Sequence, residues 1–267
     1  MKATVMDIQG KPKGNVELPK AFSAKVREDI IRRAVLAERS EKRQTYGADP
    51  MAGKRTSAHY HGKRHYRFTM MNREMARMKR IHGSGFLSYT ARFVPQAIKG
   101  RKAHPPKAEK NWKEKINKKE WLAALYSSVS ASSNKEMIAA RNHMIGDVKH
   151  VPVVIDDKLQ ETKKSSEVVK ILESVGLKKE LERVKLKRKN AGRAKTRGRK
   201  TAQKKGPIII VGEDKGIIKA ARNMAGVDVT TLGDLSVEMM APGTHPGRLS
   251  VWTKSAVERL AETTKKA

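Results

Sequence analysis

The sequence PIIIVG at residues 207–212 is the clearest buried strand of the chain. Four β-branched residues stand in a row between a proline and a glycine, and such a bounded apolar run is typical of a strand. Because no polar residue alternates with the apolar ones, both faces of this strand are expected to be buried. The run therefore predicts a parallel sheet with helices packed on both of its faces.

The C-terminal half repeats this alternation of strand and helix. The further predicted strands are residues 151–155, 227–232 and 249–252, and the predicted helices are residues 165–175, 178–184, 215–225 and 253–262. Apolar strands separated by helices predict a mostly parallel α/β sheet whose strands are joined by right-handed crossovers.

The N-terminal part adds shorter elements. These are a hairpin of residues 2–8 and 15–18, a helix that starts at Ser23, and helices over residues 119–129 and 134–145. Residues 1–45 and 111–267 are therefore assigned to one globular α/β domain. The chain has no Cys and no apolar run near the ~18 residues that a membrane span needs, so a soluble intracellular protein is expected.

Positive charge is concentrated in two segments. The chain carries 59 Lys and Arg against 27 Asp and Glu, a formal net charge of +32. Residues 51–110 hold 15 basic and two acidic side chains, and residues 183–205 hold 12 basic and no acidic ones. Because these segments can bury almost nothing, their missing folding partner is expected to be a polyanion, with nucleic acid as the default candidate.

Residues 46–110 are predicted to leave the domain as a long, basic, extended loop. Within residues 51–110 only four side chains are Leu, Ile or Val, but six of the twelve aromatic residues lie there, interleaved with Lys and Arg. Cations neutralise phosphates and rings stack on unpaired bases, so the pattern favours folded RNA over duplex DNA. One local helix is predicted where Met71, Met75 and Met78 share a face, with Thr69 as its cap.

The segment 183–205 is predicted to bind RNA from within the domain. Its cations alternate with small residues such as Gly192 and Gly198, which let the backbone approach a phosphate chain closely. Arginines in this setting offer paired N–H donors to phosphate oxygens. The alternative, a solvated tail or localisation signal, is disfavoured because the segment lies between sheet elements.

The sequence contains no recognisable catalytic site. No glycine-rich phosphate loop follows a predicted strand, and Glu213 and Asp214 stand where a pyrophosphate would have to bind. The pair Asp156 and Asp157 follows a strand but has no partner His or nucleophile. We therefore expect no enzymatic activity and no cofactor.

Three histidines in the basic loop have a spacing that invites comparison with a metal site. His59, His61 and His65 stand close together, but cations surround them and no carboxylate or thiolate adds ligand charge. The sequence therefore predicts no metal, and contact with RNA is the favoured role of these imidazoles.

Several ordered motifs resemble one known family. They are YGADPxAGxRTSA at 46–58, VPQAxKGRxAHPPK at 94–107, AG at 191–192 with RGRK at 197–200, AARNxAG at 220–226 and APGxxxGRL at 241–249. The chain resembles, nearly end to end, the archaeal and eukaryotic branch of the fourth large-subunit ribosomal protein family. The resemblance implies a non-enzymatic cytoplasmic protein whose domain lies on the large subunit. It also implies that the loop enters the rRNA and reaches the exit-tunnel wall, beside the twenty-second large-subunit protein and the nascent peptide.

The resemblance and the charge pattern together nominate a set of rRNA-binding residues. In the loop they are Arg55, Arg64, Arg67, Arg73, Arg92, Lys99, Arg101, Lys102, His104 and Lys107, and in the domain Lys187, Arg188, Arg193, Lys195, Arg197, Arg199, Lys200 and Arg248. The chain departs from the family pattern at about residues 59–82, which are longer here and rich in Met and His. The candidates for the tunnel tip are Arg64, His65, Arg67 and Arg73.

Two alternatives from other classes remain. An RNA-modifying enzyme would need a cofactor pocket at a switch point of the sheet, which the missing glycine fingerprint disfavours. A DNA-compacting protein would bind duplex DNA and structured RNA with similar affinity.

Overall fold

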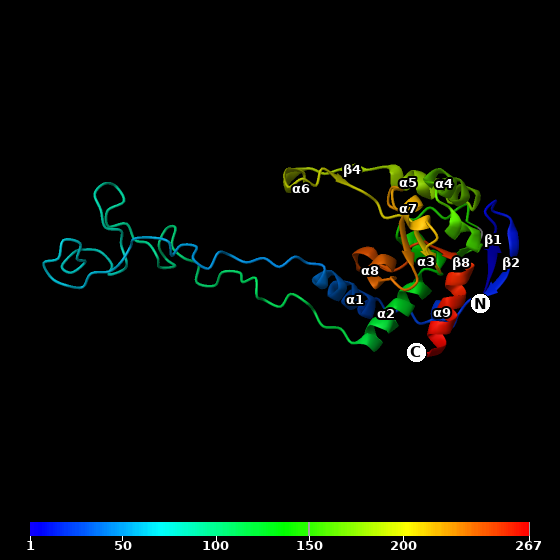
Figure 1. Ribbon diagram of the computed structural model, residues 1–267, viewed down its shortest axis with the longest axis horizontal. Coiled ribbons are helices and arrows are strands. Elements are labelled where there is room, and N and C mark those ends of the chain that lie inside the picture. The colour runs from blue at the N-terminus through cyan, green and yellow to red at the C-terminus, as the bar shows by residue number, and fades with distance from the viewer. Residues whose placement is uncertain (149, 267) are drawn as a thin grey trace. The chain divides into compact units, whose positions relative to one another are not determined.

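The computed structural model describes residues 1–148 and 150–266 (Figure 1). The chain divides into two compact units, here named the sheet unit (Met1–Lys42 with Lys113–Ala267) and the basic unit (Arg43–Trp112). Within the described residues, no helix is long and apolar enough to cross a membrane.

The sheet unit is built on a six-stranded sheet with the order β2-β1-β3-β8-β6-β7. Its strands are β1 (Lys2–Met6), β2 (Pro12–Glu17), β3 (Val153–Ile155), β6 (Ile208–Val211), β7 (Asp228–Thr231) and β8 (Ser250–Thr253). Strand β2 pairs antiparallel with β1, and all other neighbours are parallel. The predicted α/β class with a mostly parallel sheet is confirmed.

The apolar run that predicted this sheet lies inside it as β6. Ile209 pairs with Val229 of β7 on one side and with Val251 of β8 on the other. All four residues of β6 are fully buried, which is worth about 1.5–3 kcal/mol for each such side chain. Alternate residues of the strand enter opposite cores, Ile208 one and Ile209 the other, as the period of two requires.

Helices cover both faces of the sheet (Figure 1). On the face of Ile208 and Ile210 lie α1 (Glu28–Glu41), α2 (Lys118–Ala131), α8 (Val237–Met240) and α9 (Lys254–Lys266). On the face of Ile209 and Val211 lie α3 (Lys135–Ala140), α4 (Ser165–Ser174), α5 (Lys178–Lys185) and α7 (Ile217–Ala221). Short 3-10 turns connect these elements at η1 (Lys20–Ser23), η2 (Asp157–Glu161) and η3 (Pro242–Thr244).

Two helix predictions were wrong in their details. Ser23 does not cap the first helix, because its hydroxyl donates to the Lys20 carbonyl and closes η1 instead. The methionine-rich stretch after Thr69 is not helical. Asn72 has a left-handed backbone (φ +56°), and the Thr69 hydroxyl accepts from the Met71 amide in a local turn, both of which compete with a helix.

Candidate nucleic-acid interface

The segment 183–205 contains the end of α5 (Lys178–Lys185) and a small basic hairpin, residues 188–202. Strand β4 (Arg188–Lys189) pairs antiparallel with β5 (Thr201–Ala202), and the short helix α6 (Gly192–Thr196) lies between them. Asn190 fastens the hairpin, because its backbone amide donates to the Lys200 carbonyl at 2.9 Å and its side-chain amide to the Arg199 carbonyl at 3.0 Å. The backbone is thus ordered by its own hydrogen bonds, although α6 buries no side chain.

The cations of this hairpin point into solvent. Seven of the predicted rRNA-binding residues are exposed here: Lys187, Arg188, Arg193, Lys195, Arg197, Arg199 and Lys200. In the part of the chain that the structure describes, none of the seven forms an ion pair with a carboxylate. A concentration of like charge held on an ordered backbone without counter-charge is the expected footprint of a phosphate-binding surface.

Arg248 does not belong to this surface, which corrects the prediction that it contacts rRNA. Its side chain is fully buried and pairs with Asp228 at 2.6 Å. Its Nε and Nη1 atoms donate to the carbonyls of Gly206 (2.8 Å) and Met239 (2.7 Å). These bonds connect the guanidinium to the residues just before β6, to β7 and to α8, and it cannot reach a phosphate without leaving the core.

In the basic unit, two runs far apart in sequence lie side by side. The Ala48 amide donates to the Pro106 carbonyl at 2.8 Å. Gly53 has φ +74°, and a Cβ there would lie 2.6 Å from the backbone of Arg101. The crossing of the two runs therefore requires glycine at position 53.

A cleft of about 920 Å³ opens between these runs, residues 47–54 and 99–109. Four of the predicted rRNA-binding residues line it: Lys99, Arg101, Lys102 and Lys107. Lys54 also lines the cleft and was not among the predicted residues. Asp49 and Glu109 also line the cleft, and its lining includes no aromatic side chain, so it offers cations for phosphate contacts but no ring for base stacking.

The other predicted rRNA-binding residues of this unit differ in their exposure and in their hydrogen-bond partners. Arg55 is exposed and pairs with Asp49, and His104 is exposed. Arg92 is half-buried and donates through Nη1 to the Ile98 carbonyl at 2.8 Å, so part of its guanidinium supports the loop itself.

The tip candidates Arg64, His65, Arg67 and Arg73 are all exposed. Two of them lie over rings of their own chain: Arg67 over Phe68 at 5.2 Å, and Arg73 over Tyr89 at 4.5 Å. Some of the rings and cations that were predicted to contact RNA therefore form cation–π contacts with each other inside the unit. Phe86, which the site prediction had not included, leaves 93% of its surface exposed.

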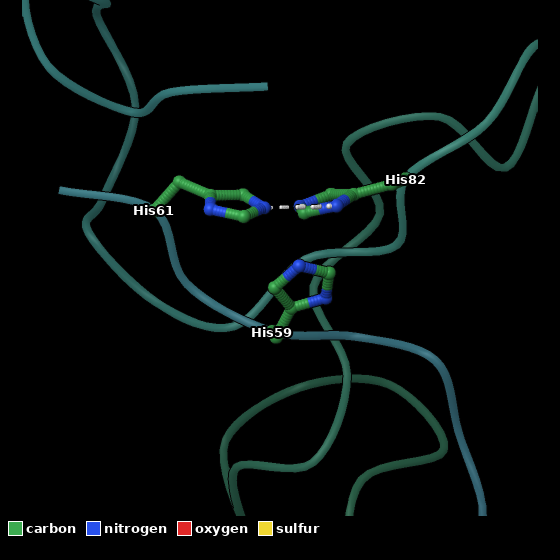
Figure 2. Close-up of side chains that lie close together, drawn as sticks. All are labelled: His59, His61 and His82. Carbon is green, nitrogen blue, oxygen red and sulfur yellow. Dashed lines mark hydrogen bonds between the residues drawn. The ribbon is translucent and has the colours of Figure 1, made fainter. Parts of the chain in front are cut away.

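Three imidazoles meet in this unit, and only two of them belong to the 59–61–65 spacing noted in the sequence. His59 and His61 lie against His82, whereas His65 is exposed and not in the group (Figure 2).

The two carboxylates weighed as catalytic have structural roles. Asp156 pairs with Lys13 at 2.5 Å, and the hydrogen bond from Lys13 is the main reason why its pKa lies below the ordinary value. Asp157 accepts from the Ser255 amide at 2.9 Å and from the Gln160 side chain at 3.0 Å. Asp156 therefore links the end of β3 to β2, and Asp157 links it to the start of α9.

Comparison with known proteins places these features in one family. The family model described as "Ribosomal protein L4/L1 family" matches residues 16–263. The chain is 43% identical over 263 residues to "Large ribosomal subunit protein uL4" of Archaeoglobus fulgidus, covering 98% of this chain and 99% of that protein. It is 44% identical over 264 residues to the protein of the same name from Methanopyrus kandleri, covering 98% of each.

Proposed function

Since the chain belongs to the ribosomal protein L4/L1 family, we propose that it is a structural, rRNA-binding protein of the large ribosomal subunit. It acts by binding and not by catalysis. The observation that carries the proposal is the set of exposed cations between residues 187 and 200, in and beside the β4–β5 hairpin, which form no ion pair with a carboxylate among the residues that the structure describes. When these cations neutralise phosphates, counterions are released, and this release favours the complex with RNA.

Binding uses two surfaces with different roles. The hairpin of the sheet unit anchors the protein on rRNA, because its backbone is already ordered before binding. The basic unit, with its cleft between residues 47–54 and 99–109, follows the RNA backbone as an extended loop that leaves the domain. In line with the family resemblance, we place its tip at the exit-tunnel wall, near the twenty-second large-subunit protein and the nascent peptide.

The salt dependence of rRNA binding tests this function. The logarithm of the affinity for a large-subunit rRNA fragment is expected to fall linearly with the logarithm of salt concentration, by about 0.7–0.9 for each neutralised phosphate. With six or more contacts, the affinity falls by about 10³ or more between 50 and 200 mM salt. A filter-binding titration measures this slope. Salt-insensitive binding, or equal affinity for duplex DNA of the same length, would refute the proposal.

A further inference from the structure

Three histidines from distant positions meet in the basic unit. His59 and Arg80 form an antiparallel bridge in which each amide donates to the other's carbonyl, at 3.3 and 3.2 Å. This pairing brings His82 beside the run that holds His59 and His61. One ring nitrogen of each histidine lies within 4.8 Å of those of the other two (Figure 2).

The spacing of two of these nitrogens fits a tetrahedral metal centre. His61 Nε2 and His82 Nδ1 are 3.3 Å apart. Zinc–nitrogen bonds of about 2.0–2.1 Å in tetrahedral geometry put the ligand nitrogens about 3.3–3.4 Å from each other. By contrast, 3.3 Å is long for a hydrogen bond, whose usual length is about 2.9–3.0 Å. The pair is therefore better spaced for sharing an ion than for sharing a proton.

The third imidazole is held in the tautomer that a metal requires. His59 Nδ1 lies 3.1 Å from the Ser57 carbonyl, and a carbonyl can only accept, so Nδ1 carries the proton. The lone pair is then on Nε2, and Figure 2 shows a ring nitrogen of His59 turned toward the other two rings. A backbone carbonyl that fixes the far nitrogen is the usual support of a metal-binding histidine.

The surroundings favour the neutral form of the other two rings and limit the movement of His82. Burial, and next the neighbouring His59, lower the pKa values of His61 and His82 below the ordinary value, which favours the unprotonated form that binds metals. The ring of Phe68 stacks on His82 at 4.6 Å and 5°, so the imidazole cannot turn freely.

We propose that His59, His61 and His82 form a three-histidine site for a divalent transition-metal ion, with Zn²⁺ as the preferred occupant. Three neutral imidazoles leave the charge of the ion uncompensated and a fourth position open, so a water molecule or an anionic oxygen completes the tetrahedron. The bound ion would close the loop of residues 62–81, whose ends are otherwise joined by the bridge at His59. The sequence predicted no metal here, because cations surround His59, His61 and His65 and no carboxylate or thiolate adds ligand charge, and it did not indicate that His82 lies beside the first two.

Metal titration of histidine variants tests the proposal. The full-length protein is titrated with Co²⁺, followed by its visible absorption, and then with Zn²⁺ in competition, with Mg²⁺ as a hard cation that imidazole disfavours. We expect one Co²⁺ and one Zn²⁺ per chain and no effect of Mg²⁺. His82→Gln is expected to weaken Zn²⁺ binding by at least about 100-fold, because even the loss of an outer-shell partner costs about 10–100-fold.

The matched control is His65→Gln, which removes an exposed histidine of the same segment and should change the affinity less than about twofold. A second measurement is limited proteolysis within residues 62–81, which Zn²⁺ should slow in the wild type and in His65→Gln but not in His82→Gln. The titration is repeated with the chain bound to an rRNA fragment. Metal binding is then measured both in the free protein and in the RNA-bound protein. The proposal is overturned if neither state binds Zn²⁺ one to one, or if His65→Gln lowers the affinity as much as His82→Gln.

Discussion

Replacing Arg193, Arg197 and Arg199 together with Ala is expected to weaken binding to large-subunit rRNA by about 1000-fold or more. Hydrogen bonds to charged groups contribute about 1.5 kcal/mol or more each, and 1.4 kcal/mol corresponds to a factor of ten. The salt slope should also fall by about 2–3, since each lost phosphate contact removes about 0.7–0.9. Because all three side chains are exposed, the free energy of unfolding should change by less than about 0.5 kcal/mol.

The control for this triple variant removes the same charge elsewhere. Lys163, Lys170 and Lys178 are exposed lysines around α4 and α5, outside both basic segments. Their replacement with Ala should lower the rRNA affinity less than about tenfold, because general attraction to a polyanion is screened beyond about 10 Å at 0.1 M salt. Equal losses in the two triple variants would mean that net charge, and not the hairpin, determines binding.

Replacing Glu180 with Gln is expected to lower the free energy of unfolding at pH 7 by about 3–5 kcal/mol. The Glu180 side chain is fully buried and accepts from Arg183 at 2.7 and 2.8 Å, from His143 at 2.7 Å and from the Met144 amide at 2.9 Å. An amide in its place cannot accept all of these bonds, and it leaves the Arg183 charge without its partner. Chemical denaturation followed by circular dichroism measures the change.

The pH dependence of this effect follows from the pKa of Glu180. Burial by itself would raise that pKa, but the hydrogen bonds from Arg183, His143 and Met144 outweigh it and lower the pKa from 4.5 to about 2. The carboxylate therefore stabilises the fold above pH 4.5, and this stability is lost as the pH falls from 4.5 toward 2. At pH 3 the difference between wild type and Glu180→Gln should be smaller by about 2 kcal/mol. A difference that stays constant with pH, or an equal loss in the exposed control Glu182→Gln, would contradict this role.

The fold could be predicted because its determinants are local. The continuous apolar run at 208–211 predicts one structure, a strand that is buried on both faces. In the structure this strand lies between β7 and β8. The composition also predicted that residues 183–205 bind RNA, which stays a prediction, but it did not predict the β4–β5 hairpin that these residues contain. By contrast, the predicted helix after Thr69 failed because side-chain hydrogen bonds and the left-handed Asn72 compete with helical periodicity.

The parts of the site that were missed depend on tertiary contacts. Arg248 has the sequence neighbours of an RNA-binding arginine, but its role follows from Asp228, 20 positions away in the chain. His82 likewise meets His59 only through the bridge at Arg80. A sequence motif therefore shows which chemical groups are present. It does not show which of them are already hydrogen-bonded to, or in contact with, residues far away in the sequence.

Sedimentation with purified large ribosomal subunits tests the central claim most directly. A tagged copy of the chain, expressed in cells, is expected to sediment with the large subunit at moderate salt and to leave it only at high salt, because rRNA phosphates hold it. The triple hairpin variant should leave at lower salt than the triple lysine control. Recovery of the wild-type chain only at the top of the gradient at moderate salt, or with bulk DNA, would contradict the account.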